Sequence, residues 1–150
     1  IFSLFTLLLL TSFQQTTSIV KTLNKINNTF KTMEVKLINW PKNLQPKLGK
    51  LKRTAFIAFP KKEMKGKIPL LISLHGGGGK KWSIEEQLKR SAKVKGLSLV
   101  ELAGKNLILL EPNSSEKWDP KTLNIMLDYI LEIPQAICSL HILLLFLLLF

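Results

Sequence analysis

Short apolar runs predict four strands in the middle of the chain. Residues 34–39 alternate apolar and polar side chains, which is typical of a half-buried strand, and residues 53–59 predict a second strand that ends at Pro60. Residues 68–74 and 106–110 are almost continuously apolar, which is typical of strands that are buried on both faces of a sheet.

Two helices are predicted, one after each of the buried strands. Ser83 and Glu86 fit a capping box, in which each side chain accepts a hydrogen bond from the other residue's amide, so we expect a helix over residues 83–96. Asp119 before Pro120 predicts the start of a second helix. Apolar residues follow at helical spacing: Leu123, Met126, Leu127, Ile130 and Leu131. This order of elements predicts an α/β fold with a mixed sheet.

The two ends of the chain differ from the middle. Residues 1–10 are apolar and are followed by small and polar residues, which predicts a signal peptide over residues 1–18 and a secreted or extracytoplasmic protein. Residues 19–33 are polar and predict a linker, so we expect the domain to cover residues 34–137. Residues 138–150 form an uncharged apolar tail without strand alternation or helical amphipathicity, and we expect this tail to lie outside the domain, as an out-of-frame or unspliced segment would.

The charge and the rare residue types exclude several classes of function. The formal net charge is +12, but only two of the 22 basic residues are Arg, the usual reader of base edges and phosphates. We therefore expect a solvated basic surface and no specific nucleic-acid partner. The single Cys and the two His have no metal-ligand spacing, so we expect no metal, no cofactor and no internal disulfide.

The segment LISLHGGGGKK, residues 71–81, carries the candidate chemistry. A phosphate loop, G-x-x-x-x-G-K-[ST], would need a glycine at Leu74 and a hydroxyl at Lys81. A dinucleotide loop, G-x-G-x-x-G, would need its last glycine at Lys81 or Trp82. Glycines after a buried strand instead fit an oxyanion loop, whose backbone N–H groups approach a developing negative charge and whose backbone takes unusual dihedral angles.

The run P-L-x-x-x-L-H-G-G-G at residues 69–78, the helix after it and NLILLEPN at residues 106–113 resemble the N-terminal third of an α/β-hydrolase. They are most similar to secreted esterases of the polyhydroxybutyrate depolymerase and feruloyl esterase type, and the resemblance covers residues 53–137. It implies a serine carboxylic ester hydrolase whose mixed sheet is truncated before the nucleophile strand. Trp118 is similar to an aromatic residue that precedes the helix before the nucleophile.

The resemblance implies a role for each residue of the loop. It places the oxyanion donors at the backbone amides of Gly77 and Gly78, with Gly76 forming the turn. His75 would be a structural residue whose imidazole bonds the loop backbone, because the catalytic histidine comes last in the order Ser, acid, His. Trp82 would either line the acyl pocket or pack against the following helix.

The nucleophile and the base that the resemblance requires are absent. All eight glycines lie at or before Gly104, so no G-x-S-x-G exists, and the nearest approach, residues 96–100, lacks the second glycine. His141 lies in the apolar tail without a partner acid. We expect an esterase lineage acting on ester substrates, in which this chain holds the oxyanion loop, is inactive toward esters and folds marginally.

A second interpretation belongs to a different class. The chain would be a small basic membrane-associated protein without catalysis, whose apolar termini contact the membrane and whose glycines form an ordinary turn. Retention in membranes after carbonate extraction, if it depends on residues 138–150, distinguishes this interpretation from the first.

Overall fold

A computed structural model of the chain describes residues 4–30, 32–62, 68–92, 107–132 and 142–146, with the backbone alone for residues 4–16 and 142–146. The elements are α1 (Leu4–Thr29), β1 (Met33–Asn39), η1 (Gln45–Leu48), β2 (Thr54–Pro60), β3 (Leu70–Leu74), η2 (Gly77–Lys81), α2 (Ile84–Ser91), β4 (Ile108–Glu111), α4 (Pro120–Leu131) and β5 (Ile142–Phe146). η1 and η2 are short 3₁₀ turns.

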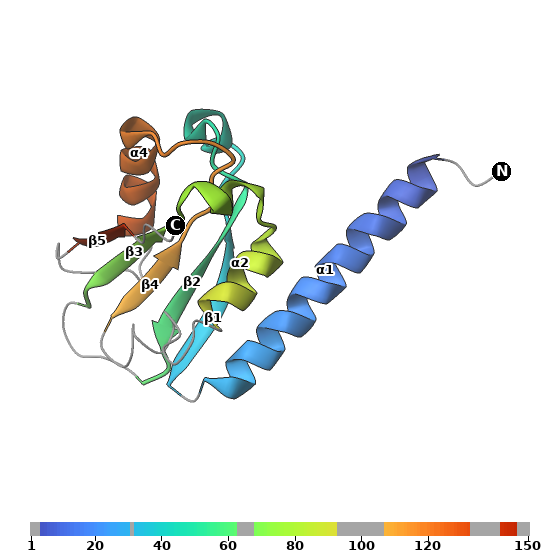
Figure 1. Cartoon of the computed structure of the whole chain (residues 1–150), viewed down its shortest axis with the longest axis horizontal. Helices are drawn as coiled ribbons and strands as arrows, with labels where there is room; N and C mark the ends of the chain where they lie inside the picture. The colour runs from blue at the N-terminus through green and yellow to red at the C-terminus, as the bar shows by residue number, and fades with distance from the viewer. Residues whose placement is uncertain (1–3, 31, 63–67, 93–106, 133–141, 147–150) are drawn as a thin grey trace.

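The strands form one mixed sheet in the order β1-β2-β4-β3-β5 (Figure 1). β2 runs antiparallel to both β1 and β4, whereas β3 runs parallel to β4 and to β5. Thus β4, which follows β3 in the chain, lies between β2 and β3 in the sheet. The expected α/β class with a mixed sheet is confirmed.

The two faces of the sheet are covered by different helices. On one face, Met126 and Ile130 of α4 are buried against a cluster that includes Leu70 and Leu110. On the other face, Leu88 of α2 is buried in a second cluster with strand residues and with the end of α1 (Figure 1). The connections after β3 and β4 therefore leave the sheet toward opposite faces, and the carboxyl ends of two such strands are where open α/β sheets bind ligands.

The starts of α2 and α4 were predicted correctly from local sequence signals. Ser83 and Glu86 form the predicted capping box: the Glu86 amide donates to Ser83 Oγ over 3.1 Å, and the Ser83 amide donates to Glu86 Oε2 over 2.8 Å. The Asp119 carboxylate caps α4 by accepting from the Thr122 amide over 3.1 Å. These bonds use amides that have no partner inside the helix.

The segment expected to be a linker, residues 19–33, is different in the structure. Its first part continues α1 to Thr29, and Ile26 and Phe30 are buried in the second cluster. Packing against the sheet, which a polar local composition does not reveal, stabilises this helix. The N-terminal half of α1 extends past the sheet (Figure 1). No helix of the described part has both the length and the apolarity that a membrane-spanning segment needs.

The side chain of Asn27 covers part of the free edge of β1. Its Nδ2 donates to the Val35 carbonyl over 3.0 Å, and its Oδ1 accepts from the Val35 amide over 2.7 Å. A neighbouring strand would bond the same two groups, so Asn27 occupies a position where a second chain could otherwise pair.

Asn27→Ala is expected to lower the free energy of unfolding by about 2 kcal/mol, because the amide and the carbonyl of Val35 both lose a partner. Urea unfolding measures this loss. Asn28→Ala is the matched control, since Asn28 is exposed and should change stability by less than about 0.5 kcal/mol. Equal effects of the two substitutions would contradict this role of Asn27.

Part of the C-terminal apolar tail lies in the sheet. Ile142–Phe146 form β5, paired in parallel with all five residues of β3. The tail was expected to lie outside the domain, but in the structure this stretch pairs with β3. His141 and Cys138 lie outside the described residues.

Candidate functional site

The glycine loop begins where β3 ends at Leu74. Gly76 is extended, with φ −73° and ψ −173°, and η2 starts at Gly77. Gly77 and Gly78 are exposed, and in the described part of the chain neither of their amides donates a hydrogen bond. Such free amides are expected in the first turn of a helix.

One glycine of the loop is required by a close approach. Gly79 is buried, and a Cβ at this position would lie 2.3 Å from Cγ of His75. At Gly77 and Gly78 a Cβ would meet nothing within 4 Å. The unusual backbone angles expected for the loop are not present, since Gly49 is the one described glycine with a positive φ. Position 79 therefore requires glycine because any larger residue would overlap the His75 ring.

His75 links the loop to the segment that follows β4. Its Nε2 accepts from the Ser114 amide over 3.0 Å, so the ring proton is on Nδ1, which lies 2.8 Å from the Gly76 carbonyl and donates to it. The carbonyl of His75 accepts from Trp118 Nε1 over 2.9 Å, and the two ring centroids are 4.7 Å apart. An imidazole bond to the loop backbone, as expected for His75, is therefore present.

Trp82 lies at the other end of the loop, between η2 and α2. Its amide donates to the Gly79 carbonyl over 3.0 Å, which closes the 3₁₀ turn. Arg90 of α2 stacks over the indole ring, 4.4 Å from the ring centroid. This contact agrees with the packing role for Trp82 rather than with a pocket wall.

A buried polar cluster behind the loop was missed from sequence. Glu111 at the end of β4 accepts a hydrogen bond from Ser91 Oγ over 2.5 Å, and Gln87 Nε2 donates to the Pro112 carbonyl over 3.0 Å. Asn113 Nδ2 donates to Gln87 Oε1 over 2.6 Å. The one signal in the sequence was an acidic residue at the end of an otherwise apolar strand, because Gln87 and Ser91 come from a helix that is distant in the sequence.

Burial changes the ionisation of Glu111. The residue is 4% exposed, and within the described part of the chain its Oε1 has no hydrogen-bond partner. Desolvation raises the pKa of Glu111 to about 8, and the Ser91 hydroxyl opposes this shift only partly. The carboxyl group is therefore mainly neutral at pH 7, and it contributes little charge to the cluster behind the loop.

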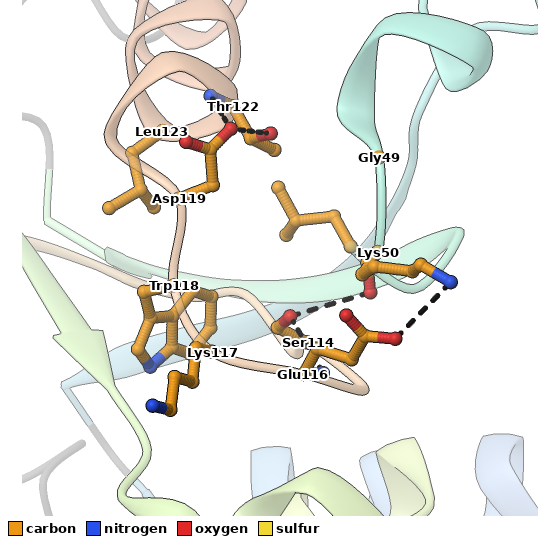
Figure 2. A pocket seen from close by; sticks show the side chains of 10 residues that line it. Gly49, Lys50, Ser114, Glu116, Lys117, Trp118, Asp119, Thr122 and Leu123 are labelled. Atoms are coloured by element: carbon orange, nitrogen blue, oxygen red, sulfur yellow. Dashed lines mark hydrogen bonds and ion pairs between the residues drawn. The ribbon is translucent and has the colours of Figure 1, made fainter.

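A cavity of about 170 Å³ lies next to the Ser114–Trp118 segment, which bonds His75 (Figure 2). Residues of the β1–β2 connection, including Leu51, form one wall, and the start of α4 forms the other. The glycines of the loop are not among its lining residues. Ser114 and Trp118, which both bond His75, line the cavity, whereas Gly77 and Gly78, the expected oxyanion donors, do not.

Three of the four charged residues that line this cavity have partners in the described part of the chain, and Lys117 has none there. Asp119 is engaged with Thr122, whose hydroxyl bond, followed by its amide bond, lowers the pKa of the Asp119 carboxyl group. Lys50 pairs with Glu116 over 3.2 Å, and both side chains are exposed (Figure 2). This cavity therefore offers a small surface of mixed polarity.

The structure brings together His75, Gly77 and Gly78 of the expected site with Trp118. The serine near miss at residues 96–100 lies outside the described residues. Among the described residues, no group of three or more His, Cys, Asp or Glu side chains has the arrangement of a metal site. Comparisons with protein-family models, with curated proteins and with solved structures found no match to the chain.

Proposed function

We propose that this chain carries the oxyanion loop of a serine carboxylic ester hydrolase of the α/β-hydrolase type. In such enzymes one of the oxyanion donors comes from the loop between the third strand and the first helix of the core. Here the glycine loop connects β3 to α2, at the carboxyl end of a buried parallel strand. The sequence contains no G-x-S-x-G, so the proposal assigns to these residues the anion-binding part alone.

The pair of free amides at Gly77 and Gly78 carries the proposal. Both glycines are exposed, and both have open space where a Cβ would be, so a substrate atom can approach the N–H groups. The ends of the loop are held by His75 and Trp82, which keeps the donors in place before a ligand arrives. Fixed donors of this kind stabilise the negative charge of a tetrahedral intermediate more than the neutral ester.

Secretion is part of the proposal. Cleavage of a signal peptide between residues 11 and 18 would leave the part of α1 that contacts the sheet. Thr22 Oγ1 donates to Glu85 over 3.2 Å, and Ile26 and Asn27 contact the sheet further along. The membrane-associated alternative requires residues 138–150 to enter a membrane, whereas Ile142–Phe146 pairs with β3. Carbonate extraction, as described above, decides between the two.

A titration with a methylphosphonate monoester tests the donors directly. This anion has the tetrahedral geometry of the intermediate in ester hydrolysis, and it needs no nucleophile in the protein. In ¹⁵N-labelled protein, we expect saturable downfield shifts of the Gly77 and Gly78 amide protons. The Gly79 amide, which already donates to Gly76 over 3.0 Å, should shift much less. The same protein should hydrolyse p-nitrophenyl acetate no faster than the uncatalysed background.

Gly77→Val is the control for the titration, because its side chain fills the open space beside the donors without a contact in the folded chain. The saturable shift should disappear in this variant. Shifts that are equal at Gly79, or that survive in Gly77→Val, would show binding elsewhere and contradict the proposal. Ester turnover that is lost in Gly77→Val would instead show that the chain is active, against the expected inactivity.

A further inference from the structure

We infer that the Lys52 side chain is a positioning residue for the glycine loop, because its ammonium group holds the Trp82 carbonyl at the point where the loop ends. Lys52 Nζ donates to this carbonyl, and Asn113 Nδ2 donates to it as well, over 3.3 Å. The carbonyl is thus held by two donors from segments that are distant in the sequence.

The backbone of Lys52 is itself fixed, so the side chain starts from a defined position. The Lys52 amide donates to the Asn113 carbonyl over 2.8 Å, and the Lys52 carbonyl accepts from Trp40 Nε1 over 2.9 Å. Next to it, Leu51 forms an isolated bridge with Ser114. A lysine anchored in this way loses less side-chain freedom on forming its hydrogen bond than a freely exposed lysine.

The segment Asn113–Ser114 then contacts both ends of the loop. The Ser114 amide bonds His75 at the start, and Asn113 bonds Trp82 at the end. Lys52 adds the one charged donor to this arrangement, and hydrogen bonds from charged groups are stronger than neutral ones. Partial burial lowers the pKa of Lys52, with Glu86 opposing the shift, which indicates that water only partly screens the ammonium group.

The positions of the loop amides depend on this carbonyl. The Trp82 amide donates to Gly79, and the Gly79 amide donates to Gly76, so the turn that presents Gly77 and Gly78 is closed by bonds that end at Trp82. Without Lys52, one donor to the Trp82 carbonyl remains, and the turn should open more often. The inference concerns the loop of the proposed function, but its first test does not depend on that function.

Hydrogen exchange of the Gly79 and Trp82 amides tests the inference in the ligand-free protein. Lys52→Met should accelerate the exchange of both amides about tenfold, since a charge-assisted hydrogen bond is lost. Lys52→Arg should restore slow exchange, and Lys52→Gln, with a neutral donor, should lie between. Lys47→Met is the matched control, because Lys47 is exposed and should leave the exchange unchanged. If Lys52→Met does not fold, the exchange rates of the two amides in Lys52→Arg and Lys52→Gln are compared instead, and equal rates would contradict the inference.

Binding of the methylphosphonate monoester gives the second test. If the inference is correct, the affinity for the phosphonate falls in Lys52→Met and recovers in Lys52→Arg. The melting temperature of the two variants should stay close to that of the unmodified protein. Unchanged exchange at Gly79 and Trp82 in Lys52→Met would overturn the positioning role, even if affinity fell through lost charge alone. If the unmodified protein shows no phosphonate shift at Gly77 and Gly78, the proposed function fails, while the exchange rates still decide the role of Lys52.

Discussion

Between about pH 5 and about pH 9, the unmodified protein is expected to lose roughly 4 kcal/mol of stability that Glu111→Gln does not lose. The folded-state pKa of Glu111 is about 8, whereas the ordinary value is 4.5. A raised pKa means that the stabilising contribution is fully present below the unfolded value and is lost as the pH rises through the folded value. Between the two pKa values the folded protein keeps a proton that the unfolded chain has released, and above the folded value it holds a buried carboxylate.

Urea unfolding of the two proteins at several pH values measures this difference, and subtraction removes the contribution of the other titrating groups. Glu116→Gln is the control, because the Glu116 side chain is 60% exposed and pairs with Lys50 at the surface. Its effect on stability should be small at every pH. A difference between the unmodified protein and Glu111→Gln that is independent of pH would show that Glu111 is not the group responsible.

Gly79→Ala is expected to lower the free energy of unfolding by about 3 kcal/mol, because the new methyl group and the His75 ring cannot occupy the same space. If the ring moves, the Ser114 amide also loses its acceptor. Thermal unfolding measures the loss, and the imidazole ¹⁵N shifts report whether His75 keeps its proton on Nδ1.

Gly77→Ala and Gly78→Ala are the matched controls, since they make the same chemical change in the same loop. Neither glycine has a positive φ or a neighbour at the position of a Cβ, and alanine is favoured over glycine in helical turns. Both variants should therefore be as stable as the unmodified protein or slightly more stable. Three equal losses would refute the specific role of Gly79.

The sequence predicted the elements whose signals are local. The caps at Ser83 and Asp119 depend on side chains and amides within three residues of each other, and both formed as expected. The buried strands were visible as apolar runs, because burial on both faces removes the need for polar positions. The α/β class followed from the order of these elements.

The features that the sequence did not predict depend on distant contacts. Residues 19–33 were predicted to be a linker from their polar composition, whereas the packing of Ile26 and Phe30 against the sheet, which composition does not show, stabilises the end of α1. Ser91 and Glu111 are 20 residues apart, so their pairing required the fold itself. The glycine loop was predicted, but the specific requirement for glycine at position 79 was not. Four consecutive glycines cannot be told apart by sequence until the position of the His75 ring is known.

The position of β4 in the sheet affects the stage of folding at which the amides of Gly77 and Gly78 reach their final positions. The two bonds that join the loop to the end of β4 span 39 residues for His75–Ser114 and 31 residues for Trp82–Asn113. Contacts of this range form after local structure, since the intervening chain must first be closed. Until β4 inserts between β2 and β3, the glycines are an unanchored loop with two lysines at its end. The geometry of the proposed anion-binding loop is thus expected to form late in folding, after the sheet has been assembled in the correct order.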